Sequence, residues 1–195
     1  MNSSTVKEMT PDDVPLASDI IALAFAADPV TRWTWPDPRI YLAAMPRLVR
    51  AFAGKAFDCG SAYCVGEFAG AALWLPPGLE PDREVMGELM QSTLTPSQLE
   101  RALALFQQMA AYHPHEPHWY LPLIGVDPAQ QGKGFGDALM VHALARIDRE
   151  GVAAYLESTN PRNISLYRRH GFEPLGEIRA GESPPLVPML RRARG

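Results

Sequence analysis

Three glycines at alternate positions, Gly132, Gly134 and Gly136, stand directly before an amphipathic helical pattern in the stretch VDPAQQGKGFGDALM (126–140). The N-terminus of a helix presents unpaired backbone N–H groups and the positive end of the helix dipole, which attract anions. Glycines let a phosphate group approach that backbone without a clash against a Cβ. Lys133 can add a positive charge. The spacing therefore predicts a loop that binds phosphate or pyrophosphate.

Two other glycine-rich motifs that bind phosphate groups do not match the residues of this stretch. A P-loop would need a glycine where Asp127 stands and a serine or threonine where Gly134 stands. A dinucleotide fingerprint, G-x-G-x-x-G/A, would end on Asp137 or on Leu139, depending on its first glycine. The pattern that remains is Q-x-x-G-x-G, starting at Gln131 between a predicted strand and a predicted helix. A glycine-rich turn without a ligand is the alternative to an anion site.

The second stretch that could do chemistry is LESTNPRNISLYRRHGF (156–172), in which a strand leads through two asparagines into a helix. Helical spacing places Asn163, Tyr167 and His170 on related faces. Asn160 is also a good helix cap, a role that can coexist with ligand binding. For Tyr167 the alternative is a packed aromatic ring with its hydroxyl at the surface.

Glu157 lies on a predicted strand, 152–159, whose other residues are mostly small or apolar. A carboxylate in such a strand either lines a cleft or pairs with an arginine as part of the structure. Its closeness in sequence to the turn at Asn160 favours the cleft. We therefore take Glu157 as the candidate general base, acting directly or through a water molecule.

Taken together, QQGKGFG and LESTNPRNISLYRRHGF resemble the acetyl-CoA-binding segments of the GNAT superfamily of N-acetyltransferases. The resemblance implies direct transfer of an acetyl group from acetyl-CoA to an amine through a tetrahedral intermediate. It also implies that the backbone at the splayed end of strand 118–126 holds the acetyl carbonyl. Asn160 or Asn163 would contact the pantetheine arm or the pyrophosphate, and Tyr167 would lie near the thioester sulfur. The cofactor-binding residues expected on this basis are Ile124, Gly125, Val126, Gln131, Gly132, Lys133, Gly134, Phe135, Gly136, Asn160, Asn163 and Tyr167.

Within the superfamily, the chain is similar to puromycin N-acetyltransferase and its relatives over 112–175 and, more loosely, through AFAADPVTRWTWPDP near the N-terminus. Asp28 stands where those enzymes carry an aromatic residue. The tryptophans of the chain could line an acceptor pocket, although buried packing is the default for each of them. We expect Asp28, Trp33 and Trp119 to contact the acceptor.

The implied reaction assigns two catalytic roles. The amine must lose a proton in order to attack, and the leaving thiolate must be tolerated or protonated. Glu157 is the expected base. Tyr167 is expected to protonate the thiolate, a direction taken as feasible because its reference pKa of about 10 exceeds the thiol's of about 8.5.

A cluster of histidines, HPHEPH (113–118), invites a metal site formed by His113, His115, Glu116 and His118. The two prolines between them allow neither helical nor steady strand spacing, so a zinc site is not favoured. The preferred interpretation is a lid or a wall of the cleft, and no metal is expected.

Periodicity and capping signals predict the elements that must position these residues. The C-terminal half reads strand–helix–strand–helix–strand, which indicates a mixed sheet. The expected fold class is α/β (α+β), with a mixed, mostly antiparallel central sheet flanked by helices, in a single domain over 1–195. Strands are expected at 5–10, 61–76 (a hairpin), 118–126, 152–159, 172–180 and 185–192, and helices at about 12–27, 40–57, 82–91, 96–111, 134–150 and 161–170.

Composition narrows the partners. The chain has 195 residues with a formal net charge of −4, which argues against nucleic acid as the main partner. No apolar run approaches the roughly 18 residues of a membrane-spanning helix, and the start lacks a secretory pattern, so no membrane partner is expected. The cytoplasm is the default location, and Cys59 and Cys64 are expected to be reduced thiols.

The expected function is that of an acetyl-CoA-dependent N-acetyltransferase acting on the primary amine of a small molecule, as a monomer or homodimer. A non-catalytic sensor or scaffold that binds acyl-CoA is one alternative. A peptide or protein N-acetyltransferase, which would differ only in its acceptor groove, is another. The intact 131–136 loop, Tyr167 and Glu157 favour an enzyme.

Overall fold

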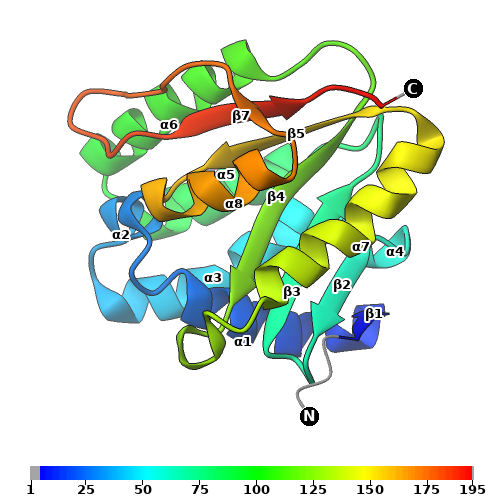
Figure 1. Ribbon diagram of the computed structural model, residues 1–195. Helices are drawn as coiled ribbons and strands as arrows, with labels where there is room; N and C mark the ends of the chain where they lie inside the picture. Colours follow the sequence, from blue (N-terminus) through cyan, green and yellow to red (C-terminus); the bar gives the residue numbers. More distant parts are fainter. Residues whose placement is uncertain (1–4, 195) are drawn as a thin grey trace.

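A single seven-stranded sheet with helices on both faces organises the computed structural model, which describes residues 5–194 (Figure 1). The strand order is β1-β2-β3-β4-β5-β7-β6. The pair β4–β5 is parallel, and the other five pairs are antiparallel, which confirms the expected mixed sheet. The strands are β1 (Val6–Glu8), β2 (Ala62–Val65), β3 (Gly70–Leu75), β4 (His118–Val126), β5 (Ala153–Ser158), β6 (Glu173–Pro174) and β7 (Val187–Arg191).

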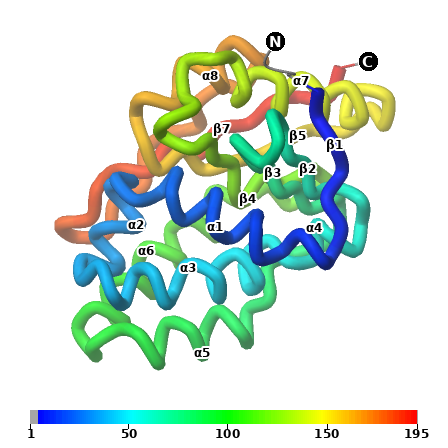
Figure 2. Tube along the Cα trace, turned by 90° about the horizontal axis from the view of Figure 1, so that it is seen from below, coloured from blue at the N-terminus to red at the C-terminus, as the bar shows by residue number. Residues whose placement is uncertain are grey.

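The helices are divided between the two faces of the sheet, as Figure 2 shows. Helices α1, α3, α4, α5 and α6 contribute to the core on one face, and α7 and α8 contribute to the core on the other. The bounds are η1 (Pro11–Asp13), α1 (Val14–Ala24), α2 (Pro29–Thr34), α3 (Pro38–Ala53), α4 (Lys55–Asp58), α5 (Arg83–Thr93), α6 (Pro96–Tyr112), η2 (Pro128–Gln130), α7 (Phe135–Glu150), η3 (Pro161–Asn163) and α8 (Ile164–Arg169).

The two central strands are buried on both faces. Side chains alternate along a strand, so Tyr120 of β4 and Tyr155 of β5 join the core beneath α3, while Trp119 and Leu156 join the core beneath α7. Each of these four residues is at most 4% exposed. Polar side chains on β4 and β5 therefore lie inside the molecule, where each one needs a partner or a function.

Local sequence signals set most of the element boundaries. Thr95 caps α6 and exchanges hydrogen bonds with Gln98, with a proline at the first helical position, as the sequence predicts. Helix α7 begins after Gly134 and ends at Gly151, and both glycines have positive φ. The predicted helix 40–57 is interrupted at Gly54, where a Cβ would collide with the Arg50 carbonyl oxygen.

The structure differs from the expectation in two further places. The short helix α2 was not predicted; it begins at Pro29 and is capped by Asp28. The segment 172–180 is mostly not a strand, because β6 has two residues and ends at Pro174, which has no N–H to donate. Beyond it, a single bridge joins Ile178 to Leu186.

Candidate active site

The strands β4 and β5 separate at the centre of the sheet. They pair only over His118–Tyr120 against Ala153–Tyr155, and beyond this point they diverge, as Figure 1 shows. On its other edge β4 has a bulge, because its register with β3 shifts between Leu73 and Leu75. Pro122 lies within the bulge, where its missing N–H breaks no regular ladder bond.

Past the bulge, β4 offers backbone donors to this opening. Asp127 N donates to Ala69 O of the loop before β3 at 2.9 Å. Because backbone groups alternate between the two edges of a strand, the N–H groups of Ile124 and Val126 point away from β3 and toward β5. The carbonyl oxygen of Val126 accepts a bond from Gln131 Nε2 at 3.2 Å. The expected donors for an acetyl carbonyl thus face the opening.

The glycine loop leads from β4 into α7. Gly132 and Gly134 have φ of 78° and 80°, and a Cβ on either would meet nothing within 4 Å. Their backbone conformation requires glycine, and open space lies in front of it. Lys133 Nζ donates to Gln130 Oε1 at 2.6 Å, which holds the positive charge at the loop. The helix N-terminus, the open space and the lysine together suit a phosphate group.

Two of the expected cofactor residues have packing roles. The side chain of Phe135 is 3% exposed and lies in the core beneath α7, so only its backbone can face a ligand. A Cβ at Gly125 would lie 2.5 Å from Ala24 Cβ, so this glycine lets α1 pack against β4. Gly136, in contrast, would place its Cβ 3.4 Å from Leu166 of α8, in ordinary van der Waals contact.

The second predicted segment forms the opposite side of the opening. Asn160 caps η3 through its Oδ1, which accepts from Arg162 N at 3.1 Å, and Asn163 immediately precedes α8. Tyr167 is 5% exposed and packs edge-on against Phe172, with 6.3 Å between ring centroids. Burial, and secondarily the Asp28 carboxylate, raises the pKa of Tyr167 above its usual range, so the phenol stays protonated.

Asp28 joins three parts of the chain. The side chain is buried, and Oδ1 accepts from Thr31 N at 2.9 Å and from Thr31 Oγ1 at 3.0 Å. Oδ2 accepts from Thr159 Oγ1 at 2.6 Å, just after β5. These bonds fix the start of α2 against the end of β5. Asp28 therefore holds the wall of the opening together while its charge acts on Tyr167.

Glu157 occupies a buried position among aromatic residues. Its side chain is 4% exposed, and Oε2 accepts from the Tyr120 hydroxyl at 2.8 Å. Among residues 5–194 it has no lysine or arginine partner within salt-bridge distance, and the one ionisable nitrogen at that range is His113 Nδ1, 3.9 Å from Oε1. The alternative to a cleft position was a structural ion pair between Glu157 and an arginine, and no such pair is present among the described residues.

The Glu157 carboxylate changes the pKa of the two tyrosines beside it. Burial first, and then the Glu157 carboxylate, raises the pKa of Tyr120 and of Tyr155 well above the usual range. The Tyr155 hydroxyl is buried and has no partner with good hydrogen-bond geometry among the described residues. It nevertheless lies close enough to Glu157 for the carboxylate charge to raise its pKa. A buried hydroxyl without a partner requires an explanation, and a functional role beside the carboxylate is one such explanation.

An apolar cavity lies on the same face of the sheet as Glu157. Phe52, which lines it, packs edge-on against Tyr120 with 6.0 Å between centroids, so Glu157 lies one side chain behind the wall. The volume of the cavity is about 90 Å³, counted as the space open to the centres of water-sized molecules. No acidic or basic side chain is among the residues that line it. Its walls are formed by Phe25, Val30, Thr31, Thr34, Trp35, Leu48, Phe52, Met90, Ala102, Leu105, Phe106, Met109, Pro122, Leu123, Thr159 and Leu186.

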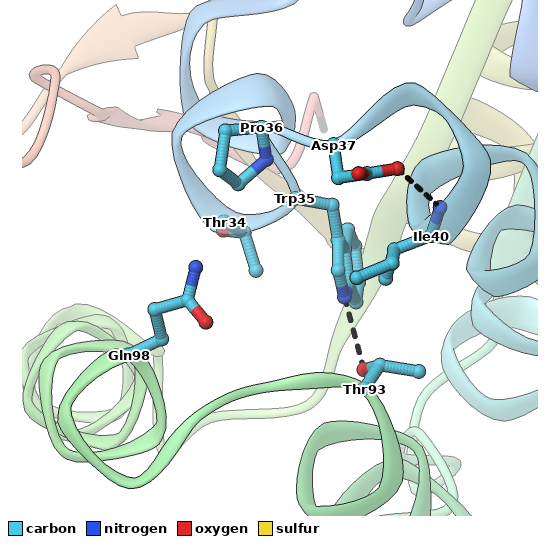
Figure 3. Close-up of a pocket in the computed structure, with 7 residues that line it drawn as sticks. All are labelled: Thr34, Trp35, Pro36, Asp37, Ile40, Thr93 and Gln98. Carbon is cyan, nitrogen blue, oxygen red and sulfur yellow. Dashed lines mark hydrogen bonds between the residues drawn. The ribbon is translucent and has the colours of Figure 1, made fainter.

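Trp35 separates this cavity from a smaller hollow outside it. Its indole Nε1 donates to Thr93 Oγ1 at 3.0 Å, and Figure 3 shows this bond together with the residues that line the hollow. The hollow has only about 30 Å³ of such space, enough for roughly one or two water molecules. Of the two, the larger cavity is the one with room for more than a few water molecules.

Two predictions for the acceptor pocket are not supported by the structure. Trp119 is 1% exposed and lies beneath α7, on the opposite face of the sheet from the cavity, where its Nε1 donates to Glu150 Oε2 at 2.7 Å. Trp33 is half-buried against the small core that contains Val30, and Arg101 lies over its ring at 5.7 Å. The tryptophan that lines the cavity is Trp35.

The histidines of HPHEPH make specific contacts. His118 Nδ1 lies 2.8 Å from the Glu116 carbonyl oxygen, and its Nε2 lies 3.0 Å from Nε2 of His113. His115 is exposed. Within residues 5–194 no group of three or more histidine, cysteine, aspartate or glutamate side chains is arranged to hold a metal ion. Nor does any helix in that range have the length and apolar character to cross a membrane.

Comparison with known sequences places this geometry in a family. The model of the acetyltransferase (GNAT) family matches residues 28–172. An uncharacterised N-acetyltransferase of Schizosaccharomyces pombe is 29% identical over 142 residues, which are 65% of this chain and 58% of that protein. A mycothiol acetyltransferase of Streptosporangium roseum is 38% identical over 63 residues, 31% of this chain and 19% of that protein. The chain thus spans less than two thirds of these relatives.

Several solved structures have a fold similar to that of this chain over nearly its whole length. A Corynebacterium glutamicum protein described as histone acetyltransferase HPA2 and related acetyltransferase is 27% identical, with a TM-score of 0.72 over 100% of this chain and 98% of that one. A polyamine N-acetyltransferase of Drosophila melanogaster is 15% identical, with a TM-score of 0.69 over 96% and 99%, and shows the same fold. The resemblance to the puromycin branch stays a prediction.

Proposed function

Because this chain belongs to the GNAT family of acetyltransferases, we propose that it transfers the acetyl group of acetyl-CoA to the primary amine of a small molecule with an apolar body. The observation that carries the proposal is the placement of one buried carboxylate, Glu157, between the opening of β4 and β5 and the apolar cavity. The opening suits the thioester arm, and the cavity suits the acceptor. The whole of residues 1–195 is proposed to act as one domain.

Acetyl-CoA supplies the activated acetyl group, and the residues of this chain are suited to hold it. The start of α7 and the glycines before it would receive the pyrophosphate, with Lys133 beside them. Asn160 and Asn163 flank the other side of the opening. The N–H groups of Ile124 and Val126 would donate to the acetyl oxygen, where negative charge develops as the amine attacks.

Glu157 is proposed to take the proton of the amine. It is nearly enclosed, and the Tyr120 hydroxyl keeps one of its oxygens in place at 2.8 Å. The other oxygen has only His113 nearby, at 3.9 Å. Because Phe52 forms part of the cavity wall and Tyr120 packs between Phe52 and Glu157, the proton reaches Glu157 through a water molecule or after a small side-chain movement.

The role first assigned to Tyr167 needs a correction. A proton passes readily from a group of lower pKa to one of higher pKa, and tyrosine, at about 10, is already a weaker acid than a thiol, at about 8.5. Burial raises the pKa of Tyr167 further, so full transfer to the thiolate becomes less favourable. We therefore propose that Tyr167 donates a hydrogen bond that stabilises the leaving sulfur and keeps its own proton.

The cavity suggests the chemical class of the acceptor. Its walls carry aromatic and aliphatic side chains and no carboxylate, so a second positive charge on the substrate would lose its hydration without compensation. Burying a phenyl-sized group there is worth about 2 kcal/mol, or roughly a thirtyfold gain in binding. An aryl- or alkylamine therefore fits better than a polyamine.

Release of free CoA tests this proposal against the alternatives. The protein is mixed with acetyl-CoA and a panel of amines, including 2-phenylethylamine, hexylamine, spermidine and a peptide with a free N-terminus, and the thiol is followed with a chromogenic reagent. Release that depends on an apolar amine supports the enzyme proposed here. Release with the peptide alone indicates a peptide N-acetyltransferase, and binding of acetyl-CoA without release indicates a sensor or scaffold.

A further inference from the structure

Two histidines that the proposed mechanism does not use lie near Glu157, His113 directly and His118 behind it. His113 follows α6 and His118 begins β4, and their rings pack edge-on with 4.8 Å between centroids. His113 also packs against Tyr120 and Tyr155, each at 4.9 Å. The side chain of His113 is 32% exposed, whereas that of Glu157 is 4% exposed. His113 therefore extends from the buried carboxylate to the surface.

The hydrogen bonds of this pair determine which ring nitrogens carry protons. A carbonyl oxygen only accepts, so the 2.8 Å contact with Glu116 O requires a proton on His118 Nδ1. In the neutral ring, His118 Nε2 is then an acceptor, and at 3.0 Å it receives the Nε2–H of His113. His113 Nδ1 is left without a proton, and this nitrogen faces Glu157.

The distance between Glu157 and His113 agrees with this assignment. A carboxylate oxygen and a bare imidazole nitrogen are both acceptors, so they have no hydrogen bond to form, and they stand 3.9 Å apart. A proton placed on either atom turns the pair into a donor and an acceptor. Closing the gap then takes a movement of about 1 Å, of the kind that catalytic groups make when substrate binds.

We propose that His113, oriented by His118, carries the proton taken up by Glu157 out to solvent. The inference rests on the proposed function, in which Glu157 accepts the proton of the amine. As the gap closes, the protonated carboxyl group passes its proton to Nδ1 of His113. When the gap reopens, the imidazolium gives this Nδ1 proton to a water molecule that reaches the ring from solvent, and it keeps the Nε2–H that donates to His118. The carboxylate and the neutral imidazole are regenerated, and no redox partner is required. His113 and His118 are positioning and relay residues, because they act through Glu157.

The surroundings of the relay contain few other groups that titrate. His113 faces Glu157, His118, Tyr120 and Tyr155, and Tyr112 lies at the end of α6 near Tyr155. The tyrosines stay protonated because burial raises the pKa of Tyr120 and Tyr155. Burial lowers the pKa of His118, which keeps that ring neutral and able to accept at neutral pH. In this cluster, the groups left to move protons are Glu157 and His113.

The experiment compares His113→Phe, which keeps a flat ring but has no nitrogen, with His115→Ala, an exposed control in the same loop. We expect kcat with an apolar amine to fall about tenfold in His113→Phe, with the KM for acetyl-CoA unchanged and the acidic limb of the pH profile displaced. The control should match the parent. In His113→Ala, added imidazole should restore the rate in proportion to its concentration, and it should do nothing for Glu157→Gln.

The role of His118 is tested by rescue with a conservative variant. His118→Leu removes the acceptor for His113, whereas His118→Gln supplies a carbonyl oxygen, so the glutamine variant should retain several times more activity. An active parent with an unaffected His113→Phe variant overturns the relay alone. Loss of activity that imidazole does not restore, accompanied by a lower melting temperature, also overturns it. A parent without any turnover overturns both the relay and the proposed function.

Discussion

Replacing Glu157 by glutamine should separate chemistry from structure. The substitution keeps the side-chain length and leaves an oxygen that can accept the Tyr120 hydroxyl now bound at 2.8 Å. It removes a negative charge from a side chain that is 4% exposed and has no lysine or arginine partner among the described residues. Relief from burying that charge offsets the weaker hydrogen bond from Tyr120, so we expect a melting temperature within about 2 °C of the parent.

Activity should change far more than stability. Losing a general base typically costs 10²- to 10⁴-fold in rate, so kcat should fall by at least about 100-fold at pH 7. The parent's kcat should decline on acidification as the base becomes protonated, and this acidic limb should vanish in the variant. The assay is CoA release at saturating amine between pH 5.5 and 9, and Glu173→Gln, an exposed carboxylate on β6, is the matched control.

The same experiment can refute the assignment. A Glu157→Gln protein that works within threefold of the parent rate but melts at a lower temperature shows that the carboxylate is structural. Asp28 would then be the remaining carboxylate beside the cavity wall, through its bonds to Thr31 and Thr159. Loss of rate with an unchanged pH profile would also contradict a role as base.

Three further predictions follow from single contacts. Gly134→Val and Gly151→Val force valine into left-handed backbone at opposite ends of α7, so both should lower stability. Only Gly134→Val should weaken acetyl-CoA binding, by tenfold or more in calorimetry. Equal affinities in the two variants would show that the loop is not part of the site. Tyr167→Phe should lower kcat by roughly tenfold and leave the KM for acetyl-CoA unchanged, and a loss below threefold would make it a packing residue. Asp148→Asn should destabilise the fold by about 1–2 kcal/mol in urea titrations, because the buried guanidinium of Arg191, now bound at 2.6 and 2.8 Å, loses its carboxylate, while the 33% exposure of Asp148 weakens the pair through solvent screening. Since Arg191 lowers the pKa of Asp148, this contribution is present above the ordinary aspartate pKa of about 3.9 and is lost as pH falls through the lower folded value, so parent and variant should converge in strong acid.

Features encoded within one short segment could be predicted from the sequence. The loop that starts α7 is determined by glycines at positive φ and by the helix that follows, all within a few residues. The cap of α6 by Thr95 and the end of α7 at Gly151 are local in the same way. Their physical causes, a side-chain cap or a left-handed backbone, need no knowledge of the remaining chain.

Features that depend on which face of the sheet a residue occupies could not be predicted. Trp119 and Tyr120 are neighbours in sequence, yet alternation places one beneath α7 and the other beside the cavity. The sequence shows the alternation but does not show which helix covers which face. For that reason Trp119 was expected at the acceptor, and Tyr120, the donor to Glu157, was missed.

Contacts between segments that are far apart in the chain could not be predicted from the sequence either. The cavity brings together Phe52 of α3, Phe106 of α6 and Pro122 of β4, whose apolar character is equally compatible with ordinary core packing. The HPHEPH cluster was recognised as unusual, but its approach to Glu157 depends on where α6 ends relative to β5. Gly125, expected at the cofactor, has a packing role that depends on Ala24 of the distant helix α1.

In the proposed reaction, the acetyl group passes from acetyl-CoA to an amine whose apolar body occupies the cavity. The most direct measurement is the mass of the product after incubation with acetyl-CoA labelled with ¹³C in the acetyl group. We predict a labelled N-acetyl product from 2-phenylethylamine, formed with a kcat/KM at least about thirtyfold above that for ethylamine, because the cavity buries the ring. Tight binding of acetyl-CoA with no labelled product from any amine would contradict the proposed reaction.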